Sequence, residues 1–554
     1  MRPIIYGKMY ELIKMIDAMY VRKRKNESGS YSVMLCVGER LPGKKHSITR
    51  MIKSFGAARD EAHLNRLIAE AESYKQHLER YSPKGKALKI LSEEDISQCC
   101  SYNTGFLDVY GEAFVSTFQG VKTKDHILDK LKNLVVMRIA APCSKRRTAL
   151  ISDEYGMSCQ VDSFYKVMDQ ITDPIKNDIK QIIYQRSSAL LSEQKKSIDI
   201  LFYDLTTIYF ETNTQDELRD FGFSKDGKHQ HVQIMVALIV TKEGLPIDYE
   251  ELPGNSYEGH TLLPVLERIK ARYQIDKTVI VADAALMNKI NLAELDAQGI
   301  EYIIAARIKN TKKDIKEAIL DAEGYQVISQ AETDSLKDIV RTKTLSSGEG
   351  DTLFVYHSTK RARKDAHDRA KALERIQKHL NSATKSKLTG ALKKSYVKIS
   401  KGCTIQIDEE KLELDALFDG FFGLRTNIKN AVPTEILAHY RGLWQVEQTF
   451  RIAKSNLEIR PVFHYTPRRI RAHFLLCFMA LALIRFVEFT LKINQIHLPP
   501  DQLSLLLHRM RKVRITNKDN QHFEILEDPP NELIPVYHAL KIKWHKKFQY
   551  LPCL

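Results

Sequence analysis

The 554-residue sequence predicts an α/β fold built on a mixed β-sheet with helices packed against it. Two observations support this prediction. Residues 197–252 contain three runs rich in β-branched and aromatic residues, separated by turn signals, as expected of strands that follow one another in a meander. Residues 260–307 then alternate helical patterns with short apolar runs, as expected of β-α-β units. With 43% apolar residues, a chain of this length can also bury several cores.

The chain is strongly basic, which limits its partners. Its 85 Lys and Arg residues exceed its 69 Asp and Glu residues, giving a formal net charge of +16. A surplus of this size favours a polyanion, either nucleic acid or an anionic membrane surface. The strongest apolar run, residues 474–489, is interrupted by Arg485 and Glu488 and is too short to span a bilayer. We therefore interpret this run as a buried helix and expect nucleic acid, with no membrane, as the partner.

The N-terminus and the cysteines indicate the cellular compartment. Residues 1–17 lack the basic-then-apolar order and the small-residue cleavage site of a secretory signal. The eight cysteines, which include the adjacent Cys99 and Cys100, follow no disulfide or zinc-ligand spacing. Reduced thiols fit this pattern best, and we expect a cytoplasmic protein.

Two segments precede the predicted sheet. Residues 1–85 begin with a basic run at 22–25 and form a small basic module. Its two strand patterns and its helix pattern lie at residues 31–39, 46–55 and 57–81. Residues 86–195 have a helical pattern and contain the basic triplet at 145–147. We expect DNA binding from both segments because their basic clusters can contact phosphates.

The elements of the predicted core follow in a recognisable order. They are strands at 197–211, 231–240 and 245–252, a helix at 260–273, a strand at 278–282, a helix at 288–298 and a strand at 302–307. Three meandering strands followed by β-α-β steps give a mixed five-stranded sheet. This is the element order of a ribonuclease H-like fold. We assign residues 196–307 to the first part of a ribonuclease H-like catalytic core.

The remaining segments depart from that order. Residues 308–431 contain long charged helical stretches and further strands, and we interpret them as an inserted domain. Residues 432–490 return to the core and include the apolar helix. Residues 491–554 are expected to form a basic C-terminal tail.

Two aspartates follow apolar strand patterns. Asp204 comes after residues 201–203 in the first core strand, and Asp283 comes after residues 279–282 in the fourth. We expect both at the edge of the sheet, where a ligand can reach them, and the first and fourth strands of a ribonuclease H-like sheet are neighbours. Two such carboxylates can hold a pair of Mg²⁺ ions about 3.5–4 Å apart. Taken singly, an aspartate in this position is more often a turn former or a helix cap.

Residues 440–454 predict one amphipathic helix that supplies the third acid. Tyr440, Glu447 and Lys454 recur every seven residues, so they lie close to a common face. Glu447 would then complete the metal site with Asp204 and Asp283. An ordinary surface helix with an ion pair between Glu447 and Arg451 would explain the same pattern.

The segments around these three acids resemble the motifs of a known enzyme family. The sequence resembles the DDE transposases of bacterial insertion sequences, in particular the group whose third block reads Tyr-x2-Arg-x3-Glu-x6-Lys. The matching stretches are residues 203–211, 252–255, 281–284, 419–427, 440–454, 460–464 and 471–473. In that group the three acids hold catalytic metal, Mg²⁺ with Mn²⁺ as a substitute, and the Tyr and Lys contact DNA phosphates. The motif's Arg falls on Leu443 here, while Arg441 lies two residues earlier.

The resemblance implies an enzyme that binds double-stranded DNA. It would bind the terminal inverted repeats of its own element, cleave them and transfer the strands into target DNA, as a homodimer on paired ends. Asp204, Asp283 and Glu447 are the implied catalytic and metal-binding residues, and Tyr440, Lys454 and Arg441 the implied DNA-binding residues. The insertion can support a flipped base in this group. Since both tryptophans, Trp444 and Trp544, lie outside 308–431, a Tyr, Phe or His would have to stack on such a base.

Two other functions remain open at this point. A catalytically dead transposase-derived DNA-binding protein would bind without cutting, although the presence of all three acids disfavours it. A ribonuclease H-like nuclease would act on hybrids or junctions, but would not require a basic module before the core or an insertion before the final acid.

Overall fold

The structure is a computed structural model. It describes residues 19–27, 29–39, 48–79, 96–224, 227, 230–273, 279–283, 289–330, 338–347, 350–381, 396–399, 405–517, 522–545 and 547–551. The chain divides into two compact units. The first comprises Met1–Leu190, Ile208–Asn213 and Thr449–Leu554, and the second comprises Leu191–Thr207 and Thr214–Gln448. The finer division into six segments remains a prediction.

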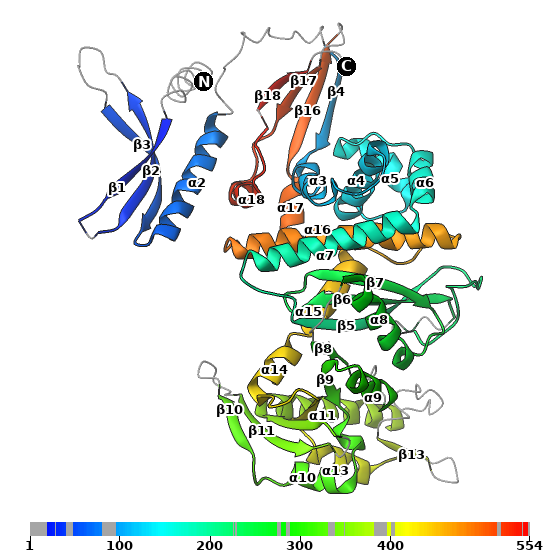
Figure 1. Cartoon of the computed structure of the whole chain (residues 1–554). Coiled ribbons are helices and arrows are strands. Elements are labelled where there is room, and N and C mark those ends of the chain that lie inside the picture. Colours follow the sequence, from blue (N-terminus) through cyan, green and yellow to red (C-terminus); the bar gives the residue numbers. More distant parts are fainter. Residues whose placement is uncertain are drawn as a thin grey trace. The chain divides into compact units, whose positions relative to one another are not determined.

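The second unit contains one nine-stranded mixed sheet. Its strands are β5 (Ile200–Tyr209), β6 (Gln233–Thr241), β7 (Pro246–Pro253), β8 (Val279–Ala282), β9 (Glu301–Ala306), β10 (Gln326–Gln330), β11 (Ile339–Ser346), β12 (Thr352–Ser358) and β15 (Phe421–Thr426). They are arranged in the order β10-β11-β12-β15-β9-β8-β5-β6-β7 (Figure 1). β8 is parallel to both β5 and β9, whereas β6–β7 and the pairs beyond β9 are antiparallel. The predicted α/β class and all five predicted core strands are confirmed.

The expectation of a five-stranded sheet is wrong. Strands from residues 308–431 extend the same sheet, because β15 pairs with the free edge of β9 and places Gly423 opposite Ala306. A Cβ on Gly423 would lie 2.6 Å from Ile308 and 3.1 Å from Ala306, so only glycine allows this close packing. The added strands have their own buried cluster, which includes Ile319 and Val355. An unpaired parallel edge would leave backbone N–H and C=O groups exposed, and β15 removes that edge.

Helices cover the sheet of the second unit. They are α8 (Leu262–Tyr273), α9 (Lys289–Ala297), α10 (Lys313–Leu320), α11 (Thr359–Asn381), α13 (Glu409–Leu417) and α14 (Pro433–Arg441). α8 shows why they form: Leu262, Val265, Leu266 and Ile269 recur at helical spacing and are all buried. α14 begins with Pro433, whose missing N–H is not needed in a first turn. A short hairpin, β13 (Val397–Ile399) with β14 (Ile405–Ile407), completes the described part of this unit.

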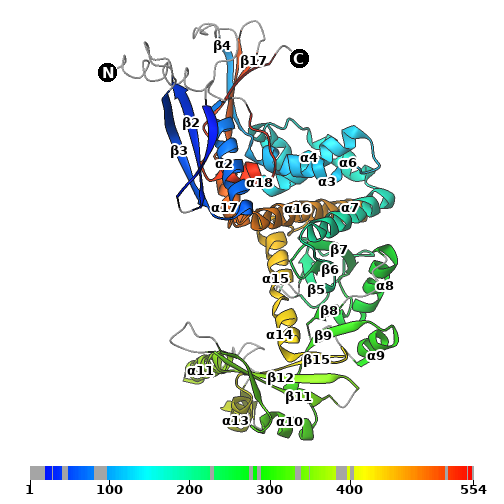
Figure 2. The same ribbon diagram turned by 60° about the vertical axis from the view of Figure 1, so that its left-hand side comes forward.

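The first unit contains a second sheet, and residues 491–554 are not an unstructured tail. Its strands are β4 (Ile96–Asn103), β16 (Arg511–Asn517), β17 (His522–Leu526) and β18 (Phe548–Leu551), in the order β18-β17-β16-β4. β4 and β16 pair over most of their length, although about 400 residues separate them. The Tyr102 hydroxyl of β4 donates to Glu524 of β17, which also accepts from Arg514 of β16 at 2.6 Å. The basic residues of the C-terminal segment therefore belong to a folded sheet (Figure 2).

The remaining helices of the first unit surround one long apolar helix. They are α3 (Glu112–Phe118), α4 (Asp125–Ala140), α5 (Lys145–Ile151), α6 (Val161–Gln170), α7 (Asp173–Ser192), α16 (Pro467–Ile493), α17 (Pro500–His508) and α18 (Leu533–Ala539). α16 packs against α4 and α6. Among the described residues it is the one helix long and apolar enough to cross a membrane, and 83% of its most apolar stretch is buried inside the structure. This confirms the predicted buried helix.

Four basic side chains are buried together in the first unit. Arg138 on α4, Lys145 on α5, His473 on α16 and His464, which precedes α16, are each less than a tenth exposed. We call them the buried basic cluster. The Arg138 guanidinium donates to the carbonyls of Cys143 (2.9 Å) and Leu457 (3.4 Å), and the His473 Nε2 lies 3.2 Å from the Ile459 carbonyl oxygen.

Burial controls the titration of this cluster. Burial and the nearby Arg138 lower the pKa of Lys145 to about 7. Burial and the charges of Lys145 and Arg138 lower the pKa of His464 to about 3. In the part of the chain that the structure describes, neither Arg138 nor Lys145 forms an ion pair with a carboxylate. The charged forms are therefore disfavoured, as expected for bases moved out of water without a counter-charge.

A small module forms the N-terminal part of the first unit. Strands β1 (Met19–Lys25), β2 (Tyr31–Glu39) and β3 (Ile48–Ala58) make an antiparallel sheet, and α2 (Glu61–Glu79) packs against it. The predicted strands at 31–39 and 46–55 are present where the structure describes them. The basic run at 22–25 is itself part of strand β1. Its charged composition gave no strand signal in the sequence.

Candidate active site

The two predicted catalytic aspartates lie on neighbouring parallel strands. Ile200 of β5 is opposite Val279 of β8, and Phe202 is opposite Val281. The same offset carries Asp204 to the level of Asp283. Asp204 lies in β5 two residues beyond the last aligned pair, and Asp283 directly follows β8, so both acids lie near the same end of the paired segment. Adjacent strands are about 4.8 Å apart, which is within the reach of two carboxylates that share a ligand. The predicted adjacency of the first and fourth core strands is confirmed.

The two aspartates differ in their local position. Asp283 directly follows the last residue of β8 and is exposed, as predicted. Asp204 lies inside β5, which continues to Tyr209, and not at its end as we expected. It is half-buried, and its Oδ1 accepts the backbone N–H of Leu205 at 2.7 Å. Since β8 stops at Ala282, the part of β5 from Tyr203 onward has no further parallel partner in β8.

The predicted continuous helix at 440–454 is wrong. α14 ends at Arg441, α15 (Trp444–Arg451) begins after a short break, and a π-helix (Ile452–Asn456) follows. The backbone N–H of Leu443 donates to the Tyr440 carbonyl at 3.0 Å, which tightens the chain at the break. Tyr440, Glu447 and Lys454 therefore lie on three successive helical segments and not on one face of a single helix.

Gly442 explains where the break occurs. A Cβ on Gly442 would lie 2.7 Å from the Cζ of Phe202, which is two residues before Asp204 in β5. Any larger residue would push α14 and α15 away from the strand. This contact holds the junction of the two helices beside the strand that carries Asp204.

Tyr440 lies in the electrostatic field of two of the predicted acids. Its side chain is half-buried. Burial raises the pKa of Tyr440, the negative charges of Asp283 and Glu447 raise it further, and the positive charge of Arg361 opposes them. These influences require Asp283, Glu447 and Arg361 to lie near the Tyr440 hydroxyl. The structure thus gathers residues from β8, α14, α15 and α11 at one place.

An open pocket adjoins Glu447. It has a volume of ≈ 670 Å³ and is lined by residues of α11, β15, α14 and α15. The lining includes four exposed cations, Lys360, Arg361, Lys364 and Arg441, and a single carboxylate, Glu447. The aromatic residues Phe422, Tyr440 and Trp444 contribute as well, and Trp444 is 54% exposed. We call this the basic pocket.

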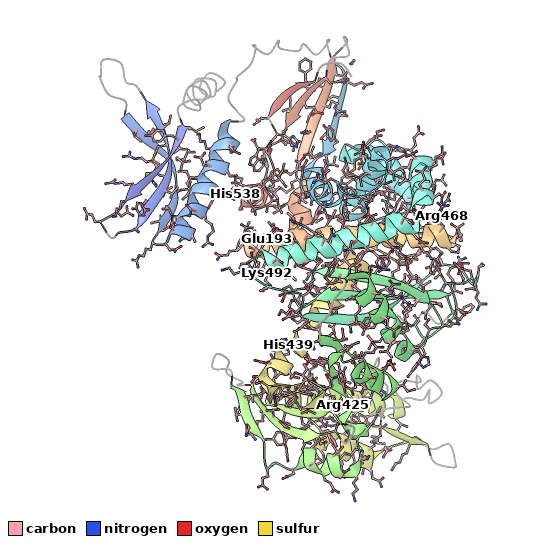
Figure 3. All side chains as sticks on the ribbon, in the orientation of Figure 1. Glu193, Arg425, His439, Arg468, Lys492 and His538 are labelled. Carbon is pink, nitrogen blue, oxygen red and sulfur yellow. The ribbon has the colours of Figure 1, made fainter. Side chains whose placement is uncertain are left out.

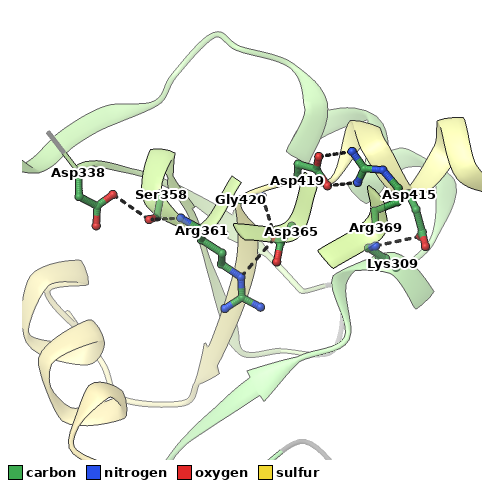
Figure 4. Close-up of polar contacts among 9 residues, drawn as sticks. All are labelled: Lys309, Asp338, Ser358, Arg361, Asp365, Arg369, Asp415, Asp419 and Gly420. Carbon is green, nitrogen blue, oxygen red and sulfur yellow. Dashed lines mark hydrogen bonds and ion pairs between the residues drawn. The ribbon is translucent and has the colours of Figure 1, made fainter. Parts of the chain in front are cut away.

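Arg361 is the cation most firmly placed in the basic pocket. Its guanidinium lies 5.0 Å from the centre of the Phe422 ring, a cation–π distance. Its Nε also lies 3.7 Å from Asp365, one turn further along α11 (Figure 4). These contacts hold the side chain while leaving it exposed.

Asp338 anchors the N-terminus of α11, which carries three of the pocket cations. Its Oδ1 accepts the Ser358 hydroxyl at 2.8 Å and the Lys360 backbone N–H at 3.1 Å (Figure 4). Burial works against ionisation of Asp338, but these hydrogen bonds and the charge of Arg441 lower its pKa overall. An ionised Asp338 thus caps α11 and lies in the field of Arg441. Sequence reasoning marked the basic cluster at 360–364, which includes Arg361, as a possible DNA contact or a solvated face, but it missed Asp338, because the place of Asp338 depends on contacts far from it in sequence.

The motif at 419–427 has a structural role. Asp419 forms a two-pronged ion pair with Arg369 of α11, and the Gly420 N–H donates to Asp365 at 3.0 Å (Figure 4). Gly420 has a φ of +82°, and a Cβ there would lie 2.7 Å from the Ser358 carbonyl oxygen, so glycine is required. Arg425, labelled in Figure 3, pairs with the buried Asp351 at 2.8 Å. This motif therefore holds α11 and β15 together at the basic pocket.

The other predicted residues are placed as follows. Arg441 is exposed and lines the basic pocket, as does Leu443, which occupies the motif position expected for arginine. Lys454 lies in the π-helix of the first unit. Their roles in DNA binding stay predictions.

The acids were tested as a metal site. Among the described residues, no group of three His, Cys, Asp or Glu side chains is close enough to hold a metal ion. Asp204 and Asp283 at equal register still fit a hard divalent cation, because Mg²⁺ is usually held by one or two carboxylates together with substrate phosphates and water. The protein alone therefore supplies part of a metal site, with room for a phosphate to complete it.

Comparison with known protein families decides the identity. Residues 195–483 match the family described as transposase DDE domain, which covers more than half of the chain and includes all the predicted acids. The chain belongs to this family. It is a DDE transposase, and enzymes of this family generally use divalent metal ions.

Comparisons with solved structures and with curated proteins do not extend this family assignment. Among solved structures, the transposase is similar to the piggyBac transposase in a synaptic complex with hairpin DNA, at 8% sequence identity and a TM-score of 0.37, over 73% of this chain and 76% of that one. A similarity of this size does not establish a shared fold. Comparison with curated proteins gives no match.

Proposed function

We propose that this transposase binds the double-stranded ends of its own element, an insertion sequence, and cuts them by metal-dependent phosphodiester hydrolysis. The freed 3′-hydroxyl then attacks target DNA in line. The pairing of β5, which carries Asp204, with β8, which Asp283 directly follows, carries this proposal, because two neighbouring carboxylates can hold a divalent metal ion. The order β7-β6-β5-β8-β9 further supports a ribonuclease H-like core, since the first and fourth strands of the core are neighbours.

The proposed cofactor is a pair of Mg²⁺ ions, for which Mn²⁺ can substitute. Asp204 and Asp283 would hold them, and Glu447 would complete the coordination once the DNA phosphate is present. The bound ions would activate the attacking oxygen and stabilise the leaving oxygen. Glu447 is exposed on α15, and its charge, like that of Asp283, acts on the Tyr440 hydroxyl, which supports placing it with these acids.

The basic pocket supplies the proposed contacts to the DNA strand. Arg361, Lys364 and Arg441 offer exposed cations to backbone phosphates. The Tyr440 hydroxyl keeps its proton because its pKa is raised, so it can donate a hydrogen bond to a phosphate. Lys454 remains a proposed phosphate contact from its motif position.

An unstacked base next to the cleaved bond has aromatic partners in this pocket. Phe422 comes from the segment predicted as an insertion, and exposed Trp444 comes from α15. Stacking on an aromatic ring contributes about 1–3 kcal/mol per base. Trp444 thus offers a partner that the expectation of a Tyr, Phe or His within the insertion did not include.

We further propose that two subunits act together on paired ends, that residues before 190 recognise the terminal repeats, and that the enzyme works in the cytoplasm on bacterial DNA. The net charge of +16 supports binding to double-stranded DNA with strongly salt-dependent affinity.

The decisive experiment incubates the protein with DNA carrying its own element's ends in Mg²⁺ or Mn²⁺. Asp204→Asn, Asp283→Asn and Glu447→Gln are each expected to lower the cleavage rate at least about 100-fold, the scale seen when one charge-stabilising group is lost. Glu317→Gln on α10 is the matched control, because Glu317 is exposed and its ion-pair partner is Lys313, one turn earlier on the same helix. Wild-type rates in any of the three variants would remove that residue from the site.

The same assay separates the proposal from its rivals. Binding without cleavage by the wild type would favour a transposase-derived DNA-binding protein. Preferential cutting of RNA–DNA hybrids would favour a ribonuclease H-like nuclease.

A further inference from the structure

The N-terminal module has two different faces. α2 covers one face of its sheet, and the residues beneath the helix are apolar: Met19, Val33, Leu35, Val37 and Ala58 are buried there. Phe55 and Tyr74 pack against the same core with ring centres 5.7 Å apart. This face is a closed hydrophobic core, as expected of a sheet packed against a single helix.

The strand register shows which basic residues lie on the opposite face. Val21 of β1 is opposite Leu35 and belongs to the covered face. Because strand side chains alternate, Arg22 and Arg24 point away from α2, whereas Lys23 and Lys25 lie on its side. All four are exposed. β1 therefore presents two guanidiniums on one face and two ammoniums on the other.

The face opposite α2, which we call the outer face, has the composition of a polyanion-binding surface. Besides Arg22 and Arg24 it presents Tyr20, Thr49, Met51 and Ser54, all exposed, with Cys36 buried among them, and the Tyr20 hydroxyl lies 3.0 Å from the Thr49 hydroxyl. Within the described residues, this face carries no carboxylate, and no ion pair neutralises either arginine. The arginines thus keep their hydrogen-bonding capacity for a partner.

We propose that the outer face of β1–β2–β3 enters the major groove of the element's terminal DNA and reads its sequence through Arg22 and Arg24. This inference rests on the proposed binding of DNA ends. Three strands span about 10 Å, which matches a major groove of about 12 Å that is known to admit a β-ribbon. A guanidinium donates two parallel hydrogen bonds to the O6 and N7 of guanine, whereas an ammonium acts as a point charge.

The test compares two double variants that remove equal charge from opposite faces of one strand. The full-length protein is titrated with a duplex carrying its own terminal repeat and with a shuffled duplex of the same composition. Arg22→Ala with Arg24→Ala is expected to weaken binding to the terminal repeat at least about tenfold more than binding to the shuffled duplex. Lys23→Ala with Lys25→Ala is expected to weaken both duplexes equally, because these side chains would reach only phosphates.

A conservative pair controls for folding and for charge. Arg22→Lys with Arg24→Lys keeps the charge of the strand and should retain binding to the shuffled duplex while losing preference for the repeat. Thermal unfolding of each variant checks that the module stays folded. Equal behaviour of the two alanine pairs, or full preference for the repeat in the lysine variant, would overturn the inference. If the wild type itself shows no preference for the repeat, the proposed end binding fails instead.

Discussion

The basic pocket of the second unit and the buried basic cluster of the first unit gather similar side chains in opposite surroundings. Lys360, Arg361 and Lys364 are exposed, and the protein leaves their charges open to solvent. Lys145 and Arg138 are buried, and the pKa of Lys145 falls to about 7. A basic side chain can bind a polyanion only if it is accessible and remains protonated at neutral pH. The comparison shows that basic residues in this chain divide into an exposed and a buried group, which composition does not reveal.

The largest expected effect is on stability, at Arg138. Arg138→Ala removes the donor to the carbonyls of buried Leu457 and half-buried Cys143. We expect a loss of about 3 kcal/mol in the free energy of unfolding, the scale of hydrogen bonds from a charged group. Urea unfolding measures this loss. Arg361→Ala in the basic pocket is the matched control and should change stability by less than about 0.5 kcal/mol; equal losses would erase the distinction between the two regions.

The second effect is on DNA affinity, in the basic pocket. Arg361→Ala combined with Lys364→Ala should weaken binding to end DNA about tenfold and reduce the slope of log K against log salt by about two, since each cation contacts one phosphate. Fluorescence anisotropy at several salt concentrations gives both values. Lys145→Met should leave the slope unchanged. A reduced slope in the Lys145 variant would mean that the buried basic cluster contacts DNA.

The third effect is a pH dependence set by Lys145. Its pKa is about 7 in the folded chain and about 10.5 when unfolded. Between these values the unfolded chain binds more protons, so stability should rise with pH from about 7 to 10.5, by at most about 1.4 kcal/mol per pH unit. Urea unfolding between pH 7 and pH 9 measures this slope. Lys145→Met should flatten it, and an unchanged slope in that variant would show that Lys145 is not the titrating group.

The sequence predicted the elements of the core well because their signals are local. The β-branched runs before Asp204 and Asp283 form β5 and β8, and the family's order of acids matches their adjacency. Local sequence signals do not give the register in which two strands pair. The exact level of Asp204 against Asp283 depends on pairing across about 80 residues of chain, and only the structure supplies it.

The failures have the same physical origin. The seven-residue spacing of Tyr440 and Glu447 suggested one helix, but the helix is broken at residues 442–443, where Gly442 packs closely against Phe202, and helical periodicity does not reveal such a tertiary contact. A five-stranded sheet was expected because charged helices dominate the pattern of residues 308–431, although β15 pairs with β9. The basic cluster at 360–364 could be recognised from the sequence as a possible DNA contact, but its place beside Glu447 could not.

The pairing of β4 with β16 has a consequence for synthesis of the protein. β4 lies near residue 100 and its partner strand begins at Arg511, so the four-stranded sheet cannot form until translation is nearly complete. The sheet of the second unit needs only residues from the middle of the chain and can assemble earlier. A product truncated before residue 511 would keep every predicted catalytic acid but leave β4 as an unpaired edge, prone to aggregation. The four-stranded sheet of the first unit can therefore form only after nearly the whole chain has been synthesised.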